Sequence, residues 1–185
     1  MNKFTIEYSE YHIAGLIQEH FPKQSNFSVS IPLTRQQKYY DLLIYSAETK
    51  KSLTIQVKSS RTYIHNIKEK KEGKYDYYAW LNNFKISEYS DYYFIFISYP
   101  IFDRKTFRPK TNYGIKILVF DKVEMEDLLS NVKTKKGTQD RFFGFGFNME
   151  EEKVFGTRGF SHMSKMDVTK NLFENKVKSL KLQML

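Results

Sequence analysis

Two carboxylates, one amide oxygen and one lysine in the first third of the chain form a set that could hydrolyse a phosphodiester. They belong to Glu10, Asp41, Gln56 and Lys58. Mg²⁺ binds hard oxygen ligands, usually one or two carboxylates together with water and substrate oxygens. Such a cation lowers the pKa of a water molecule and offsets charge on the reacting phosphate, while a lysine orients the water or stabilises the transition state. These residues can act together only if the fold brings them to one place.

The spacing of the last three residues predicts that a β-hairpin gathers them. The runs 41–46 (DLLIYS) and 53–58 (LTIQVK) are short and β-prone, and the polar turn AETKKS lies between them. Alternation along the second run puts Gln56 and Lys58 on one face. A turn centred between residues 49 and 50 pairs residue 41 with residue 58, which places Asp41 at the same end of the hairpin.

A helix over residues 8–21 is expected to bring Glu10 to this place. Ile13 and Ile17 recur at helical spacing, and Glu10 precedes them by three and seven residues. Glu10 therefore lies on the inward stripe of the helix. A carboxylate there is costly unless a cation or a lysine compensates its charge. Glu19 lies off this stripe and is expected in solvent.

Asp41, followed after 14 intervening residues by Gln56-Val57-Lys58, gives the string DLLIYSAETKKSLTIQVKSS, which resembles the PD-(D/E)XK nuclease superfamily. The resemblance is closest to small bacterial and intron-associated members, in which a first-helix glutamate precedes the hairpin as Glu10 does here. It covers residues 9–61. It implies a restriction-endonuclease-like fold in which Asp41 is the first metal ligand, Gln56 the second and Lys58 the catalytic lysine.

Two positions depart from the pattern of this superfamily. Tyr40 stands where a proline usually precedes the aspartate, and Gln56 replaces the usual acidic residue. A glutamine carbonyl oxygen can bind a metal ion but brings no negative charge. The resemblance implies that Mg²⁺, with Mn²⁺ as a possible substitute, is held by Glu10, Asp41 and Gln56.

The rest of the chain predicts a mixed α/β domain. Asp121 and Glu124 form a capping-box pattern at the start of one further helix, and another helix is expected over 167–182. No break in composition divides the chain, so one domain over residues 1–185 is expected, with a central mixed β-sheet flanked by helices. Its further strands are predicted at the β-prone runs 28–31, 75–81, 92–98, 113–120 and 141–147.

The composition favours a polyanionic partner. Lys and Arg number 30 against 21 Asp and Glu, which gives a net charge of +9 and a pI near 9.4. Nucleic acid is the commonest polyanion for a basic protein of this kind. The most apolar run, 92–97, is too short to cross a bilayer, and cysteine is absent, which excludes disulfides and thiolate metal sites. We expect a cytoplasmic protein that binds DNA and no membrane.

Basic and polar residues near the predicted site are candidates for DNA contact. One group lies in segment 59–74, which is expected to be a loop or a short helix. The other lies in a proline-containing loop between two predicted strands, together with Lys116, where cations can follow a phosphate backbone. The alternative for both groups is a solvated loop. The candidates are Ser59, Ser60, Arg61, Lys68, Arg104, Lys105, Arg108 and Lys110.

Other residues that often perform chemistry are expected to be structural here. Gly144 and Gly146 have no helix after them at the spacing of a nucleotide-binding loop, so close strand packing is the better interpretation. Tyrosines in the predicted strands could stack on bases, but strand propensity explains them as well. The four histidines do not have the spacing of metal ligands, so the sequence does not indicate a zinc hydrolase. They are His12, His20, His65 and His162.

The leading hypothesis from the sequence is an Mg²⁺-dependent DNA endonuclease of restriction or homing type. A homodimer is expected, because cutting both strands requires two active sites and a chain of this size holds one. A second hypothesis, which Gln56 supports, is a catalytically inactive nucleic-acid-binding module of the same fold. A third is a protein-interaction partner in a defence or toxin system, which would bind neither DNA nor metal.

Overall fold

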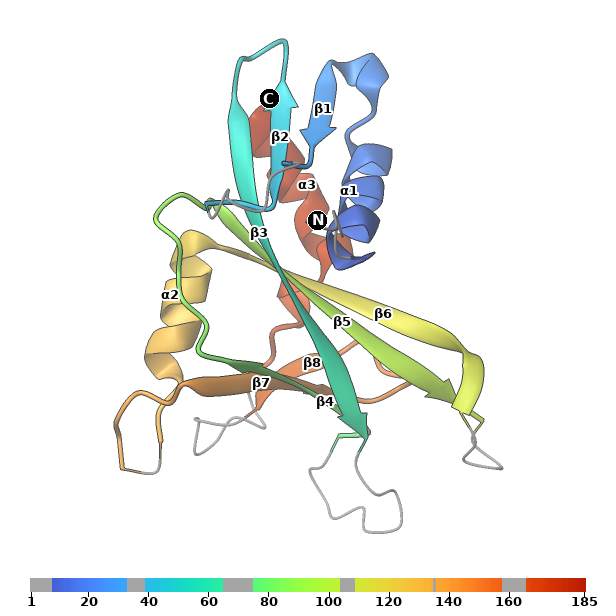
Figure 1. Ribbon diagram of the computed structural model, residues 1–185, viewed down its shortest axis with the longest axis vertical. Coiled ribbons are helices and arrows are strands. Elements are labelled where there is room, and N and C mark those ends of the chain that lie inside the picture. Colours follow the sequence, from blue (N-terminus) through green and yellow to red (C-terminus); the bar gives the residue numbers. More distant parts are fainter. Residues whose placement is uncertain (1–7, 33–38, 65–74, 104–108, 135, 158–165) are drawn as a thin grey trace, which may run out of the picture.

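A long strand, β3 (Ser52–Ile64), belongs to two sheets and connects the two halves of the molecule (Figure 1). The computed structural model describes residues 8–32, 39–64, 75–103, 109–134, 136–157 and 166–185. Within these residues it contains three α-helices and eight β-strands. The mixed α/β class expected from the sequence is confirmed, while a single domain over the whole chain stays a prediction.

The first sheet has the strand order β1-β2-β3-β5-β6. Its remaining members are β1 (Phe27–Ser30), β2 (Leu42–Ser46), β5 (Tyr92–Phe102) and β6 (Pro109–Asp121). Only the β3–β5 pair among these is parallel. The second sheet continues from the far end of β3 through β4 (Tyr77–Asn82), β7 (Phe142–Phe147) and β8 (Val154–Thr157), all antiparallel.

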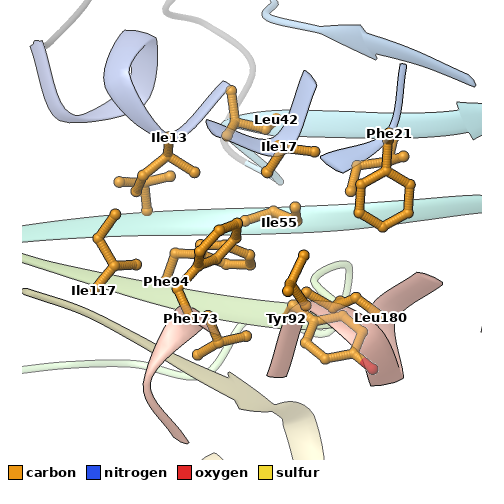
Figure 2. Packing of buried hydrophobic residues seen from close by; sticks show 14 of the residues in the cluster. Ile13, Ile17, Phe21, Leu42, Ile55, Tyr92, Phe94, Ile117, Phe173 and Leu180 are labelled. Atoms are coloured by element: carbon orange, nitrogen blue, oxygen red, sulfur yellow. The ribbon is translucent and has the colours of Figure 1, made fainter. Parts of the chain in front are cut away.

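Two apolar cores lie on the two faces of the first sheet. On one face, helices α1 (Tyr8–His20) and α3 (Phe173–Met184) cover β-strand residues that include Ile55 and Phe94 (Figure 2). On the other face, helix α2 (Lys122–Asn131) and the inner face of the second sheet cover Tyr93 and Ile95. Because both faces of β5 are covered, its residues 92–97 are all buried, which explains their unbroken apolar run.

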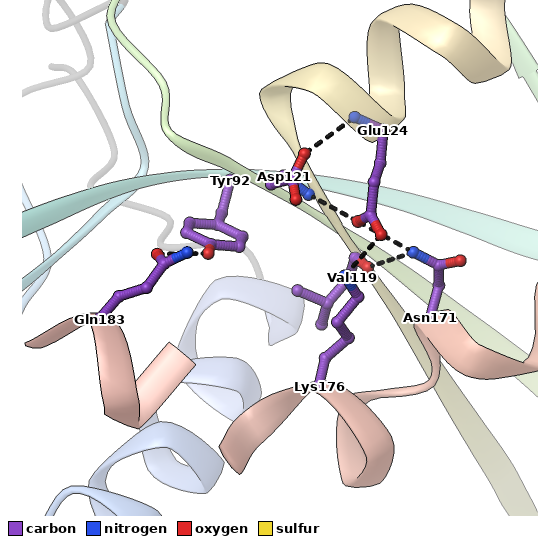
Figure 3. Close-up of polar contacts among 7 residues, drawn as sticks. All are labelled: Tyr92, Val119, Asp121, Glu124, Asn171, Lys176 and Gln183. Carbon is purple, nitrogen blue, oxygen red and sulfur yellow. Dashed lines mark hydrogen bonds and ion pairs between the residues drawn. The ribbon is translucent and has the colours of Figure 1, made fainter. Parts of the chain in front are cut away.

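The C-terminal helix is tied to the first sheet and to α2 by a polar network (Figure 3). The predicted capping box is present: Glu124 N–H donates to Asp121 Oδ1 at 2.8 Å, and Asp121 N–H donates to Glu124 Oε2 at 3.1 Å. Lys176 Nζ donates to Glu124 Oε1 at 2.6 Å. The side chain of Asn171, in the short 3₁₀ helix η4 (Thr169–Asn171), donates to Val119 O and to Glu124.

Segment 59–64 is a strand, so the prediction of a loop or short helix there was wrong. Its polar residues do not show the pattern of a strand, so the sequence did not predict one. β3 pairs here with β5 on one side, as in Ser59 with Phe96, and with β4 from Thr62 onward. The second predicted loop is also shorter than expected, because β5 runs to Phe102 and β6 begins at Pro109.

Lys116, which was expected in that loop, is a half-buried residue of β6. Its Nζ donates to Glu151 O at 3.3 Å and lies 5.4 Å from the centre of the Phe147 ring. Burial lowers the pKa of this amine from its ordinary value. Lys116 therefore fills a packing position, and the prediction of a loop residue was wrong.

The remaining elements lie close to their predicted places. The helix expected over 8–21 is α1, the helix beginning at Asp121 is α2, and the helix expected over 167–182 begins later, at Phe173. The short strand β8 and the 3₁₀ helix η1 (Lys23–Ser25) were not predicted. No helix among the described residues has the length and apolarity needed to cross a membrane.

Candidate functional site

Asp41 is fastened to β3 through its backbone and its side chain. It comes directly before β2, where its N–H donates to Ile55 O at 2.8 Å. Its carboxylate oxygen Oδ2 accepts a hydrogen bond of 2.7 Å from the backbone N–H of Val57. Because this N–H lies between Gln56 and Lys58 in the chain, the Asp41 carboxylate is held beside both residues.

The register of the hairpin differs from the predicted one by two residues. Leu42 pairs with Ile55 and Leu43 with Thr54, so residue 41 comes opposite residue 56 and not opposite residue 58. The turn lies one residue earlier than expected, with Lys50 in a left-handed conformation at φ 60°. A shift of two preserves which residues share a face. It brings Asp41 closer to Gln56 than the sequence suggested.

Gln56 and Lys58 point away from the core that lies under α1. Ile55 and Val57 alternate with them and belong to that core, so the two polar side chains lie on the opposite face, beside Tyr93 and Ile95 of β5. Lys58 is half-buried there. The sequence-based expectation that these two residues share a face is therefore confirmed.

The side-chain oxygen of Gln56 is buried without a hydrogen-bond partner in the described part of the chain. Leaving a buried acceptor unsatisfied costs about 1–3 kcal/mol, and such groups are rare in folded proteins. A cation at this oxygen would satisfy it. The glutamine that departs from the superfamily pattern thus presents a bare oxygen beside a carboxylate.

The edge of β3 is open where Asp41 meets it. Pairing with β2 ends at Ile55 and pairing with β4 begins at Thr62, so within the described residues 56–61 of β3 form ladder pairs only with β5. Part of this edge is closed by the Ser60 hydroxyl, which accepts from Trp80 N–H and donates to Trp80 O. The Asp41 carboxylate lies at the start of this unpaired stretch of β3.

A segment that sequence reasoning did not single out holds the chain before Asp41 in place. Tyr39 O accepts hydrogen bonds from the hydroxyls of Ser87 and Ser90, at 3.3 Å and 2.8 Å. The rings of Tyr39 and Tyr89 are 4.2 Å apart. Asp91 continues this support, because its carboxylate accepts from both the N–H and the hydroxyl of Thr54. The only signal in the sequence is a run of small polar residues just before the buried strand β5.

Glu10 approaches the hairpin from the other face of the sheet. It lies in the first turn of α1, which packs against β1 and β3. Tyr8 and His12 place their rings against Phe96 of β5. Glu10 is about 200° around the helix from Tyr8 and so faces away from Phe96. Gln56 and Lys58 lie on the opposite face, so no described contact brings Glu10 together with them.

The proposed DNA-contacting residues are placed only in part. Ser59 and Arg61 are exposed on β3, while Ser60 has the structural role described above. Lys110 lies within β6, and nothing is described of its side chain. Outside the described residues lie Lys68, Arg104, Lys105 and Arg108.

The donor set fits a hard divalent cation better than zinc. Asp41 and Gln56 offer oxygens at one place, Glu10 could add another, and Mg²⁺ accepts one or two carboxylates completed by water. No group of three or more His, Cys, Asp or Glu side chains able to hold a metal occurs among the described residues. His12 and His20 make ring contacts with Phe96 and Phe173, and His65 and His162 lie outside the described residues.

No known protein family matches this chain in a comparison with family models, and a comparison with curated proteins finds no relative of it.

Proposed function

We propose that this protein is a metal-dependent DNA endonuclease of restriction-endonuclease-like fold, with an active site made of Glu10, Asp41, Gln56 and Lys58. The observation that carries the proposal is the contact between the Asp41 carboxylate and Val57 N–H beside the unsatisfied Gln56 oxygen. The unsatisfied oxygen is costly for a purely structural hairpin, and an oxygen beside a carboxylate is useful for a site that holds a cation. The resemblance of the segment to PD-(D/E)XK nucleases supports the same interpretation.

Each side chain has a distinct task in this mechanism. Asp41 and Gln56 would hold Mg²⁺ with their side-chain oxygens, and Glu10 of α1 would be the third ligand, as the resemblance implies. When bound, Mg²⁺ supplies Lewis acidity and positive charge at the scissile phosphate. Lys58 keeps its ammonium group on the same face as Gln56, where it donates hydrogen bonds to the attacking water or to a phosphate oxygen.

The reaction is ordinary phosphodiester hydrolysis. The water oxygen forms a bond to phosphorus while the bond from phosphorus to the leaving sugar oxygen breaks. The water loses a proton to solvent, and the leaving oxygen gains one. The task of the protein residues is to position the water in line with the leaving oxygen and to stabilise the charge that gathers on the phosphate oxygens.

DNA is the proposed substrate because the chain carries a net charge of +9. A field of this sign attracts polyanions and speeds their association. A homodimer would place two such sites on one duplex, one for each strand, as a restriction or homing enzyme requires. The absence of cysteine suits work in a reducing cytoplasm.

The test is digestion of supercoiled plasmid by the purified protein with Mg²⁺, Mn²⁺, Ca²⁺ or EDTA. We expect nicking or linearisation with Mg²⁺ and Mn²⁺ only, and loss of at least 100-fold in rate in Asp41→Asn and Lys58→Met. Lys23→Met is the matched control, since Lys23 is exposed in η1, which lies near the turn of the hairpin and not at its Asp41 end. Absence of metal-dependent cleavage, or equal rates in all four proteins, would contradict the proposal.

A non-catalytic nucleic-acid-binding module is the second candidate, and Gln56 favours it because glutamine brings no charge to the metal site. This alternative predicts salt-sensitive DNA binding with no heat of Mg²⁺ or Mn²⁺ binding in calorimetry. The endonuclease predicts a heat of metal binding that disappears in Asp41→Asn. One titration therefore separates the two functions.

A further inference from the structure

The outer face of the second sheet carries aromatic side chains that its own core does not use. On β4, Tyr77, Ala79 and Leu81 point into the core, so Tyr78 and Trp80 point outward. On β3, Tyr63 pairs with Tyr78 and shares its outward direction. We call Tyr63, Tyr78 and Trp80 the aromatic face.

Two glycines on the neighbouring strand let rings lie against the sheet. Trp80 pairs with Gly144 of β7, and a Cβ on that glycine would collide with the indole ring. A Cβ on Gly146 would collide with the ring of Tyr75. The rings of Tyr78 and Trp80 are parallel within 3°, with centroids 5.9 Å apart. The alternation of glycine and phenylalanine in β7 thus produces a core on one side and leaves room for half-buried rings on the other.

Positive charge accompanies the aromatic face at its Trp80 end. Extending the β3–β4 register by one residue brings Arg61 beside Trp80. The guanidinium of Arg141 lies 5.3 Å from the centre of the Phe142 ring, and Phe142 pairs with Asn82 at the end of β4. Arg61, Arg141 and Tyr63 are all exposed, Tyr63 to 57%. Aromatic rings flanked by arginines suit bases flanked by phosphates.

Strand β3 connects the aromatic face to the candidate active site, because it carries Tyr63 as well as Gln56 and Lys58. Arg61 and Tyr63 follow Lys58 by three and five residues, which is roughly 10 Å and 17 Å along an extended strand. They also share the β3 face of Ser59, whose partner Phe96 is contacted by the first turn of α1. This is the face of β3 opposite to that of Gln56 and Lys58, so a nucleic-acid strand bound at both places would pass around the edge of β3.

We infer that the aromatic face binds unpaired nucleic acid, so that the substrate of this protein includes a single-stranded segment. Bases can stack on Tyr63 and Trp80 only when they are not paired, because a duplex hides their faces. The part of this inference that concerns cleavage rests on the proposed function. The binding itself does not depend on metal or catalysis.

The single tryptophan of the chain is Trp80, and its fluorescence reports on this face alone. The experiment uses the full-length Asp41→Asn protein in EDTA, titrated with a 12-nucleotide oligothymidine, with a 12-base-pair duplex and with polyphosphate. We expect saturable quenching by the oligothymidine and weak quenching by the other two. Tyr63→Ala and Arg61→Ala should each weaken oligothymidine binding at least fivefold, whereas Tyr113→Ala, which removes another exposed strand tyrosine, should not.

Quenching by polyphosphate equal to that by oligothymidine, no quenching at all, or unchanged affinity in Tyr63→Ala would each overturn the inference. The outcome is separate from that of the plasmid digestion. Binding without cleavage would reject the proposed endonuclease and keep the aromatic face. Cleavage without quenching would do the reverse.

Discussion

The carboxylate of Asp41 accepts the backbone N–H of Val57 at 2.7 Å, at the point where β2 stops pairing with β3. This hydrogen bond gives Val57 N–H a partner on the side of β3 where pairing with β2 has ended. It fixes one oxygen of the carboxylate against the strand that carries Gln56 and Lys58. The site is therefore a product of the hairpin register, because a slip of one residue would turn Gln56 and Lys58 to the other face relative to Asp41.

Asp41→Asn should separate the structural role of this residue from its charge. An asparagine oxygen can still accept the Val57 N–H, so we expect the melting temperature to change by no more than about 4 °C, the shift that about 1 kcal/mol produces. Loss of the charge should weaken Mn²⁺ binding at least tenfold in calorimetry. Asp91→Asn is the control, since Asp91 bonds Thr54 in the same sheet. Unchanged Mn²⁺ affinity would show that Asp41 is not a ligand.

Gln56→Leu should make the metal-free protein more stable and the site inactive. The substitution removes a buried oxygen that has no partner among the described residues and fills its place with methyl groups. We expect a gain of about 1 kcal/mol in the free energy of unfolding, measured by urea titration in EDTA.

Adding Mn²⁺ should then stabilise the wild type and not Gln56→Leu. Gln56→Glu should have the opposite effects. It should bind Mn²⁺ more tightly and be less stable without metal, because it buries a second carboxylate near Asp41. If Gln56→Leu is less stable than the wild type in EDTA, the glutamine oxygen is satisfied and the argument from its burial fails.

Lys176→Met should loosen the attachment of α3. Lys176 bonds Glu124, whose carboxylate also serves the α2 capping box and Asn171 (Figure 3). The two side chains are 17% and 23% exposed, so solvent weakens the pair and we expect a loss of about 1–2 kcal/mol in urea unfolding. Lys178→Met, at an exposed position of the same helix, should change stability by less than about 0.5 kcal/mol. Equal effects of both changes would contradict this role.

Alkaline pH should destabilise the fold through Tyr92. Burial, with a smaller effect of the nearby Asp121, raises the pKa of Tyr92 to about 12, although its hydrogen bond to Gln183 lowers it. The ordinary value is 10.0, so the unfolded chain loses this proton first and stability falls as the pH rises from 10 to 12. In Tyr92→Phe, the drop in urea midpoint between pH 9 and pH 11 should be smaller than in the wild type. In Tyr113→Phe, which changes an exposed tyrosine, it should be the same as in the wild type.

The sequence predicted the elements whose pattern is local. The apolar stripe of α1, the capping box at Asp121 and the alternation of phenylalanine and glycine in β7 can each be read from residues a few positions apart, and each was confirmed. The face shared by Gln56 and Lys58 followed from the same reasoning.

Features that depend on distant partners were missed. The polar run after Lys58 forms a strand because β5 and β4, far along the chain, pair with it. The hydrogen bonds from Ser87 and Ser90 to Tyr39 O join residues about 50 positions apart, and the sequence of neither segment predicts the contact. The two-residue error in hairpin register came from the turn, where Lys50 adopts a left-handed conformation that lysine rarely favours.

The most direct test of the central claim is the single-turnover cleavage rate of an end-labelled DNA duplex that carries a single-stranded extension, with Mg²⁺, for the wild type and Asp41→Asn. We predict cleavage by the wild type that stops in EDTA and a rate at least 100-fold lower in Asp41→Asn, although both proteins bind the DNA equally. Cleavage at the same rate by both proteins, or no cleavage by a folded wild type that binds the DNA, would contradict it.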